Sequence, residues 1–261
     1  MASNYPTSLD TFTNPTSNDS LNSPSHSLQH ADVNDAIEAI EAKLGIGASP
    51  AGSATAGYVL TAGTGGTTTW SALPDSGGLI QIVPTSIVKG ASGSASVSAG
   101  GAVTFSGTES ISLNGVFSST YLAYKIVASL SAPSADNFFR IRLRASGTDS
   151  SASYFGTKIS INDSGTTATY NDNNAASLGV FSMDAPNSDT VYSIFTEIIN
   201  PFSTSKTTFF MNNNGVSQAG VFNAYLGGGV HNVATSYDGF TLFPDAGNVT
   251  GSVRVYGYKN G

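Results

Sequence analysis

The chain has 261 residues, contains no cysteine and carries a formal net charge of −7, with only 10% of its residues charged. The lack of cysteine excludes disulfides, thiolate nucleophiles and cysteine-ligated zinc, and an acidic chain with few lysines and arginines is a poor candidate for nucleic-acid binding. No apolar run is long enough to span a bilayer, and the first residues lack the basic and apolar regions of a secretory signal. We therefore expect no nucleic-acid partner, no membrane insertion and no signal peptide.

Residues 1 to about 30 are rich in Ser, Thr, Asn and Pro, and such a segment cannot build a core of its own. Three prolines, Pro6, Pro15 and Pro24, impose extended or turn geometry. A few apolar residues are scattered through the segment, which favours an extended arm that docks on another protein. A floppy tail is the alternative. The predicted docking residues are Tyr5, Leu9, Phe12, Leu21 and Leu28.

A helix is predicted directly after the arm. Asp32 can accept N-cap bonds from the amides of the first turn, Lys43 suits the negative end of the helix dipole, and Gly45 can close the helix. Between these signals the apolar residues are spaced by four, three and four, as in the seam of a coiled coil. The seam residues are Val33, Ile37, Ile40 and Leu44.

The predicted helix is too short to be stable alone in water, so its seam must be buried. Isoleucine and leucine at neighbouring seam positions favour three or more helices over two. We therefore expect a homotrimer held by a bundle of identical helices. The alternative is a single amphipathic helix packed on its own domain.

Residues 46–78 change character and are rich in glycine, as linkers are. Within them, residues 58–62 and 67–71 read as two strands joined by a Gly-rich turn, with Trp70 covering the hairpin. A lone hairpin is unstable in water, so this neck would also gain from packing with copies. Its glycines do not match nucleotide-binding spacings.

Residues 79–261 show β patterns throughout, with runs of Val, Ile, Phe, Tyr and Thr between turn clusters. In residues 139–144 apolar residues alternate with three arginines, as expected of a half-buried antiparallel strand. Turns are predicted at residues 162–165, 212–215 and 244–248. Strands are predicted near residues 80–83, 95–98, 102–106, 110–113, 121–130, 138–145, 153–161, 166–170, 179–183, 190–199, 206–212, 216–226, 236–243 and 251–258.

These patterns predict an all-β fold: an antiparallel, jelly-roll-like β-sandwich head with an extended N-terminal arm and one short helix. The expected domains are an attachment arm with its oligomerisation helix at 1–45, the neck at 46–78 and the head at 79–261.

Residues suited to catalysis or metal binding are few. His26 and His30 lie four apart, so one helical turn would present both to a metal, but Pro24 argues against a helix there. His231 follows Gly-Gly-Gly-Val in a predicted loop and is expected to be a polar surface residue. Glu197 is the least expected carboxylate, in an apolar strand, and is predicted to point outward or to meet an arginine such as Arg140 or Arg142. We expect no enzyme activity, no cofactor and no metal.

A glycan-binding surface fits the head better, because sugars are held by aromatic faces beside Asn and Asp side chains. The alternative is that these are ordinary loop residues. The Asn-rich residues 171–174 lack the spacing of a calcium loop. The candidate ligand residues, in or beside predicted loops, are Tyr154, Tyr170, Tyr225, His231 and Tyr237.

Several segments resemble parts of the structural proteins of tailed bacteriophages. Residues 22–45, from Asn-Ser-Pro-Ser-His-Ser to Ile-Glu-Ala-Lys-Leu-Gly, resemble an N-terminal attachment segment. Residues 57–70, Gly-Tyr-Val-Leu-Thr-Ala-Gly-Thr-Gly-Gly-Thr-Thr-Thr-Trp, resemble a repeat of phage fibre shafts. Residues 239–260, which begin Gly-Phe-Thr-Leu-Phe-Pro-Asp, and residues 111–144, with their Asn-Gly-Val-Phe-Ser-Ser-Thr-Tyr core, resemble the β-sandwich tips of such fibres.

The resemblance implies a virion surface protein, made in the host cytoplasm, that is a trimer anchored by its N-terminus. The near absence of a shaft argues against a long fibre. We expect a short tail fibre or spike whose arm binds another virion protein of the tail, baseplate, portal-proximal region or capsid. Its head would bind a host surface glycan or protein. The alternatives are a head fibre or capsid decoration protein, and an enzyme that cleaves surface polysaccharide.

Overall fold

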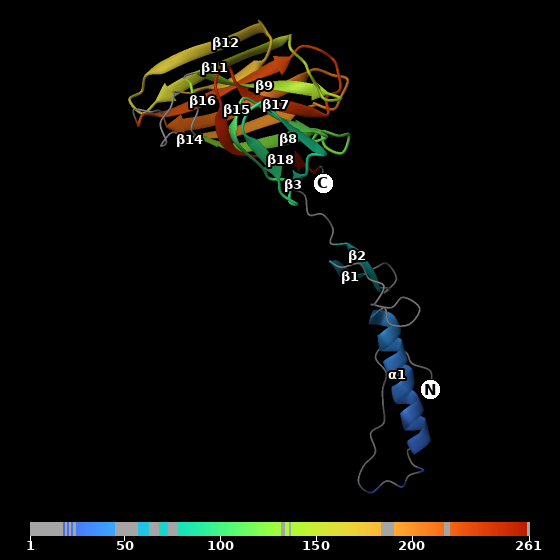
Figure 1. Cartoon of the computed structure of the whole chain (residues 1–261). Coiled ribbons are helices and arrows are strands. Elements are labelled where there is room, and N and C mark those ends of the chain that lie inside the picture. The colour runs from blue at the N-terminus through green and yellow to red at the C-terminus, as the bar shows by residue number, and fades with distance from the viewer. Residues whose placement is uncertain are drawn as a thin grey trace. The chain divides into compact units, whose positions relative to one another are not determined.

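The computed structural model describes residues 18, 20, 22, 25–44, 57–62, 68–72, 78–131, 134–135, 137–183, 191–216 and 220–259. The chain divides into two compact units, Met1–Ser76 and Gly77–Gly261. The second unit begins close to residue 79, where the sequence predicts the start of the head. Figure 1 shows both units and labels most of their elements.

The first unit contains helix α1 (His26–Leu44) and the antiparallel hairpin of β1 (Tyr58–Ala62) and β2 (Thr68–Ala72). The two predicted neck strands are thus confirmed, and the turn between them lies outside the described residues. The hydroxyl of Thr61 donates to the carbonyl of Thr69 across the pair, at 3.0 Å.

The start of the helix differs from the prediction. α1 begins at His26, so Asp32 lies inside it and is not its N-cap. The amide of Gln29 already donates to the carbonyl of Ser25 at 3.1 Å, which closes the first turn. A proline breaks a helix that runs through it but not one that begins after it, so Pro24 does not prevent helix formation at His26.

The second unit is a sandwich of two antiparallel sheets. The smaller sheet runs β10 (Thr148–Asp149), β9 (Asn137–Ala145), β17 (Gly239–Pro244), β7 (Ile111–Asn114) and β4 (Ser86–Lys89), with β13 (Leu178–Met183) also paired to β9. The larger sheet has ten strands, in the order β12 (Thr167–Ala175), β11 (Tyr154–Asn162), β16 (Phe222–His231), β15 (Thr207–Val216), β14 (Val191–Ile199), β8 (Ala123–Ser131), β18 (Val249–Tyr258), β6 (Val103–Thr108) and β5 (Ser94–Val97), with β3 (Leu79–Ile82) also on β18.

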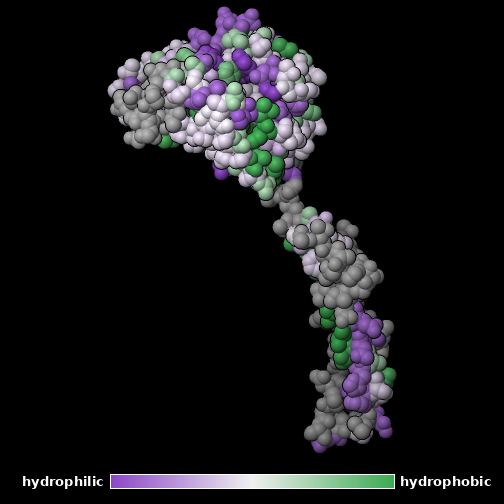
Figure 2. Space-filling model, in the orientation of Figure 1, coloured by the Kyte–Doolittle hydropathy of each residue, from purple (hydrophilic) through white to green (hydrophobic). Residues whose placement is uncertain are grey.

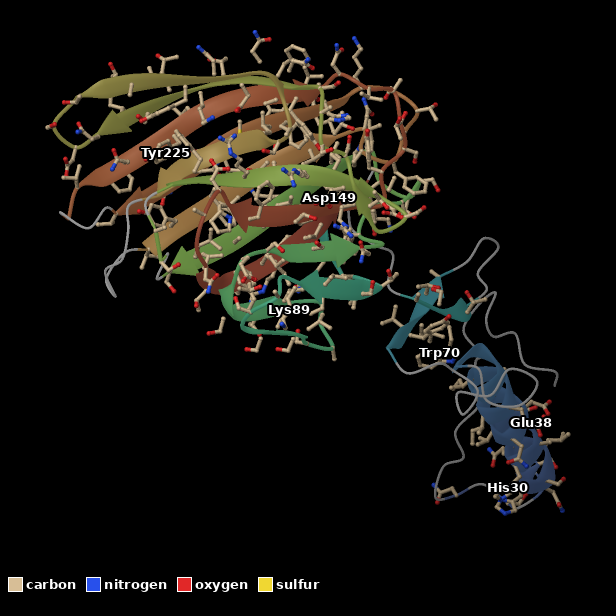
Figure 3. The ribbon with its side chains drawn as sticks, turned by 45° about the horizontal axis from the view of Figure 1, so that its top comes forward. His30, Glu38, Trp70, Lys89, Asp149 and Tyr225 are labelled. Atoms are coloured by element: carbon tan, nitrogen blue, oxygen red, sulfur yellow. The ribbon has the colours of Figure 1, made fainter. Side chains whose placement is uncertain are left out.

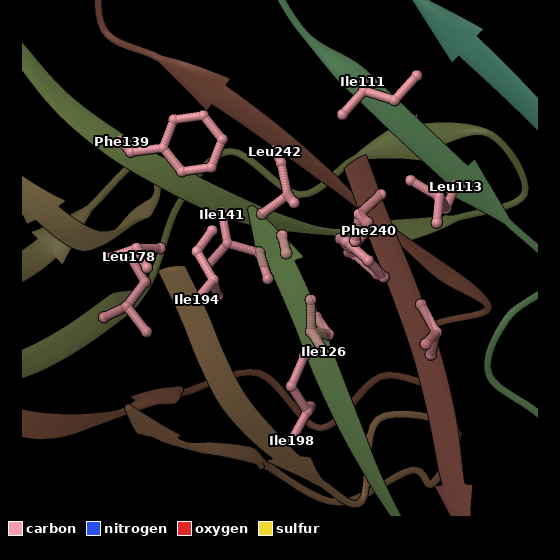
Figure 4. Close-up of a cluster of buried hydrophobic side chains, with 14 of the residues drawn as sticks. Ile111, Leu113, Ile126, Phe139, Ile141, Leu178, Ile194, Ile198, Phe240 and Leu242 are labelled. Carbon is pink, nitrogen blue, oxygen red and sulfur yellow. The ribbon is translucent and has the colours of Figure 1, made fainter. Parts of the chain in front are cut away.

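The core lies between the two sheets and follows from the period-two alternation of the strands. In β9 the side chains of Phe139, Ile141 and Leu143 are buried, while the arginines between them face the other side. Figure 4 shows side chains from both sheets, such as Ile126 of β8 and Leu242 of β17, gathered in this layer. The predicted all-β sandwich is therefore confirmed, and it is larger than an eight-stranded jelly roll.

The turn predicted at residues 212–215 is part of a strand. Residues 212–215 belong to β15, where Asn213 is fully buried and its carboxamide oxygen accepts from the amide of Phe195 at 2.9 Å. The Nδ2 of Asn213 donates to the carbonyl of Val180 in the other sheet at 3.3 Å. An asparagine that is typical of a turn thus bridges the two sheets.

The short strands β4 and β10 were not predicted.

The glycines at 227–229, predicted as a loop, lie within β16, and Leu178 of the other sheet packs against Gly229. Gly229 pairs with Gly156 of β11. A Cβ atom would lie 2.7 Å from Cδ1 of Leu178 at Gly229 and 2.5 Å from it at Gly156. The fully buried Leu178 of β13 therefore fits a notch that only glycines leave open.

Candidate functional site

The apolar seam of α1 is exposed to solvent. The exposed fractions of Val33, Ile37 and Ile40 are 45%, 49% and 45%. Leu44 ends the helix, and its side chain lies outside the described residues. Figure 2 shows apolar side chains along one side of α1 and hydrophilic ones along another. Such a stripe is a surface that a partner is expected to cover.

The predicted docking residues of the arm are placed only in part. Tyr5, Leu9, Phe12 and Leu21 lie outside the described residues. Leu28 lies inside α1, so the prediction that it belongs to an extended arm is wrong, while its docking role stays a prediction. At 100° per residue its position is on the side of the helix opposite the seam, and 59% of it is exposed.

A second apolar surface covers the outer face of the larger sheet. Neighbouring strands place Ile159 opposite Leu226, and Leu226 opposite Asn212. Phe210 lies opposite Glu197, and Glu197 opposite Lys125. We call this surface the outer-face patch; its exposed apolar members are Ile159, Ile161, Phe195, Phe210 and Leu226.

The outer-face patch contains a depression of about 450 Å³. Phe210 and Leu226, which are 55% and 50% exposed, form apolar walls. Nζ of Lys125 lies 5.8 Å from the centre of the Phe195 ring, within reach of a cation–π contact. The full lining is Lys125, Phe195, Glu197, Phe210, Met211, Asn212, Leu226 and Gly227.

Glu197 points to the outer face, which is one of its two predicted placements, and its partner is not an arginine. Its carboxylate accepts a hydrogen bond from the hydroxyl of Tyr258 in β18. Burial of the phenol and the neighbouring Glu197 carboxylate raise the pKa of Tyr258 to about 12. The depression therefore combines exposed aromatic rings with a carboxylate, an ammonium group and the amide of Asn212, which is the mixture that ligand sites use to fix orientation.

A second hollow, of about 360 Å³, lies beside the start of β8. It is rich in hydroxyl groups and has Leu122 and Phe202 as exposed apolar members. Its lining is Ser118, Ser119, Thr120, Tyr121, Leu122, Asn200, Phe202 and Ser203.

The ligand residues predicted from the sequence do not form an exposed site. Tyr154, His231 and Tyr237 are buried, and so is Tyr225, which Figure 3 marks on β16. Tyr170 is half-buried in β12, with its ring centre 5.3 Å from that of Phe138. The prediction of exposed loop residues is therefore wrong for the four buried side chains, because they fill the interior of the sandwich.

His231 belongs to a buried polar cluster instead of a surface loop. Its Nε2 lies 2.9 Å from the hydroxyl of Ser150, and its Nδ1 lies 3.1 Å from the hydroxyl of Tyr237. Burial lowers the pKa of His231. A serine–histidine pair is also found in activated nucleophiles, but this imidazole is fully buried and its second nitrogen faces a phenol and not a carboxylate. The cluster ties β16 to the segments before β11 and β17.

A buried charged group joins the two sheets at the β11–β12 edge. Asp172 of β12 accepts from Nζ of Lys158 at 3.4 Å, from Arg140 of β9 at 3.3 Å and from the amide of Gly179 at 2.9 Å. Desolvation lowers the pKa of Lys158, and the Asp172 carboxylate opposes that shift. Arg140 also contacts the more exposed Asp245, at 2.5 Å.

Among the described residues, no three histidine, aspartate or glutamate side chains are arranged to hold a metal ion. No helix in the described part of the chain is long and apolar enough to cross a membrane. The sequence matches no protein-family model, and it matches no protein among the curated sequences.

Proposed function

We propose that this chain is a structural virion protein of a tailed bacteriophage, a short trimeric fibre or spike. Its N-terminal segment binds another virion protein, and its β-sandwich head binds the host surface. The resemblance of residues 22–45, 57–70, 111–144 and 239–260 to phage fibre proteins supports the virion assignment. The resemblance covers the attachment segment, the neck and the head.

The observation that carries the proposal is the exposed seam of α1. Val33, Ile37 and Ile40 present branched apolar side chains to water along a helix of 19 residues. A helix of this length gains most of its stability from packing. Identical helices from two further copies would bury the seam on a shared axis, which closed symmetry allows without leaving a free interface.

Within the head, the depression of the outer-face patch is the surface that best fits a host glycan. A sugar ring has apolar faces that stack on aromatic side chains, and its hydroxyls need donors and acceptors around the rim. Phe195 and Phe210 supply the aromatic faces, while Lys125, Glu197 and Asn212 supply the polar rim. This site replaces the buried tyrosines as the proposed ligand surface.

Two measurements test the proposal. Light scattering of the full-length chain should give three times the monomer mass, and a monomeric chain would contradict the trimer. Gold-labelled antibody against the head should mark the tail or baseplate of purified particles. Label over the capsid would instead favour a head fibre or capsid decoration protein. Absence of the protein from the particles would refute the virion assignment.

A polysaccharide-cleaving enzyme is separated from a binder by one further assay. The protein is incubated with host envelope polysaccharide, and the release of reducing ends is followed. No release is expected from a binding protein, whereas steady release would overturn the non-enzymatic assignment.

A further inference from the structure

Two histidines face each other at the beginning of α1. Nε2 of His26 lies 3.1 Å from Nε2 of His30, with the ring centres 4.5 Å apart and the planes at 89°. Both side chains are exposed, and Figure 3 marks His30 in the first turns of the helix, with Glu38 farther along. The α-helix brings them together because residues four apart share a face.

The separation of the two nitrogens suits a single metal ion. At ordinary metal–nitrogen distances of about 2.05 Å, two nitrogens 3.1 Å apart subtend an angle of about 98° at the metal. This value lies between the roughly 90° of square-planar or octahedral sites and the roughly 109° of tetrahedral sites. Imidazole is a preferred ligand of zinc, copper and nickel.

The hydrogen bond between the rings holds the two Nε2 atoms side by side. One neutral imidazole must donate from Nε2 while the other accepts. If the donor ring carries its proton on Nδ1 instead, both Nε2 atoms have a free lone pair, and a rotation of the two rings would turn these lone pairs toward one ion. Ligand nitrogens of neutral histidines are then available without loss of a proton.

The pair also continues the seam. The positions 26, 30, 33, 37, 40 and 44 are spaced by four, three, four, three and four, so His26 and His30 occupy the two seam positions before Val33. In a parallel bundle, the pairs of neighbouring copies would meet at the same end of the seam.

We propose that His26 and His30 form a two-nitrogen site for a divalent transition-metal ion such as Zn²⁺ or Ni²⁺. We further infer that the pairs of neighbouring copies complete its coordination shell. The second inference rests on the proposed oligomer, whereas the first needs only one chain. A metal bound there would fasten the start of the bundle, next to the attachment arm.

The test is titration calorimetry of the untagged full-length chain with Ni²⁺ and with Zn²⁺, because a histidine tag would bind the same ions. His26→Gln and His30→Gln should each weaken binding by about tenfold or more, since each removes one of two linked ligands, and the double variant should not bind. Asn34→Gln, an exposed change outside the seam, should bind as the original chain does. Circular dichroism checks that each variant keeps its helix.

Either single variant binding as tightly as the original chain would overturn the site, as would absence of binding by the original chain. Light scattering of the same samples, with and without a chelator, separates the two inferences. A trimer that binds no metal removes this proposal and leaves the proposed function intact. A monomer that binds one ion per chain supports the pair but overturns both the shared shell and the trimer.

Discussion

Ser150 and His231, 81 residues apart in the chain, meet inside the head with the serine hydroxyl 2.9 Å from Nε2 of the imidazole. The other ring nitrogen faces the hydroxyl of Tyr237 at 3.1 Å. The edge of the Tyr154 ring also packs against this imidazole, with the ring centres 4.4 Å apart. Hydroxyl groups can donate or accept, so both nitrogens of a neutral His231 are satisfied.

This cluster predicts that acid destabilises the head through His231. Burial lowers the pKa of the folded imidazole below its ordinary value of about 6.5. The unfolded chain therefore binds more protons just below about pH 6.5, and the free energy of unfolding should fall as pH drops from there toward the folded pKa. Urea unfolding at a series of pH values measures this loss.

The control for this prediction is His231→Gln, whose unfolding should depend less on pH in that window. At neutral pH the substitution should cost about 1–3 kcal/mol, because it disturbs a buried hydrogen-bonding group. Both proteins contain His26 and His30, so these residues cannot cause a difference between them. An identical pH dependence would therefore contradict the prediction.

Replacing Ile37 and Ile40 by aspartate should dissociate the proposed trimer. Each carboxylate would enter a shared apolar seam, where an unpaired charge is strongly disfavoured. Ala31→Asp, an exposed change on the other side of α1, is the matched control. Light scattering should give the monomer mass for the seam variant and the trimer mass for the control; equal masses would count against the seam as the interface.

Two aspartates that share Arg140 should differ in their contribution to stability. Asp172→Asn removes the partner of Lys158, whose side chain is 4% exposed, and breaking such a buried pair costs about 3–5 kcal/mol. Asp245→Asn acts on an exposed carboxylate, for which about 1 kcal/mol or less is expected. Denaturant unfolding of the two variants side by side would show the ranking, and a reversed order would refute it.

Phe210→Ser should weaken the proposed glycan binding by about tenfold, the equivalent of about 1.4 kcal/mol of lost aromatic contact. Phe202→Ser, which removes an exposed aromatic ring from the second hollow, is the control. Binding to host cells or to their surface polysaccharide provides the measurement. Loss in Phe202→Ser alone would transfer the ligand site to the hollow beside β8.

Gly229→Ala should destabilise the head by about 1–3 kcal/mol, as overpacking does. The new Cβ would lie 2.7 Å from Leu178 and 2.8 Å from the carbonyl oxygen of Phe155. Gly100→Ala, where a Cβ meets nothing within 4 Å, is the control and should leave the thermal midpoint nearly unchanged. Equal midpoints for the two variants would show that the notch is not tight.

The sandwich could be predicted because its strands alternate locally. In β9 the order of Phe139, Arg140 and Ile141 alone indicates which face is buried, and β8 and β14 alternate in the same way. The seam of α1 is local in the same sense, because its spacing is visible within a single helix.

The buried polar cluster could not be predicted, because its members come from distant parts of the chain. Three glycines before His231 are typical of a loop, and the fit of Leu178 from the opposite sheet against Gly229 is known only once the chain is folded. Asn213 likewise reads as a turn residue until its contacts with Phe195 and Val180 are known. The outer-face patch around Phe210 could not be predicted, because its side chains come together only when β11, β16, β15, β14 and β8 pair in register.

The first and last strands of the head lie side by side. Leu79 of β3 is opposite Tyr258 of β18, and the amide of Lys259 donates to the carbonyl of Gly78 at 3.0 Å. A domain whose two ends meet in one ladder can be moved as a cassette: it can be inserted into a surface loop of a different protein or circularly permuted. Such a transfer would leave both sheets of the second unit intact.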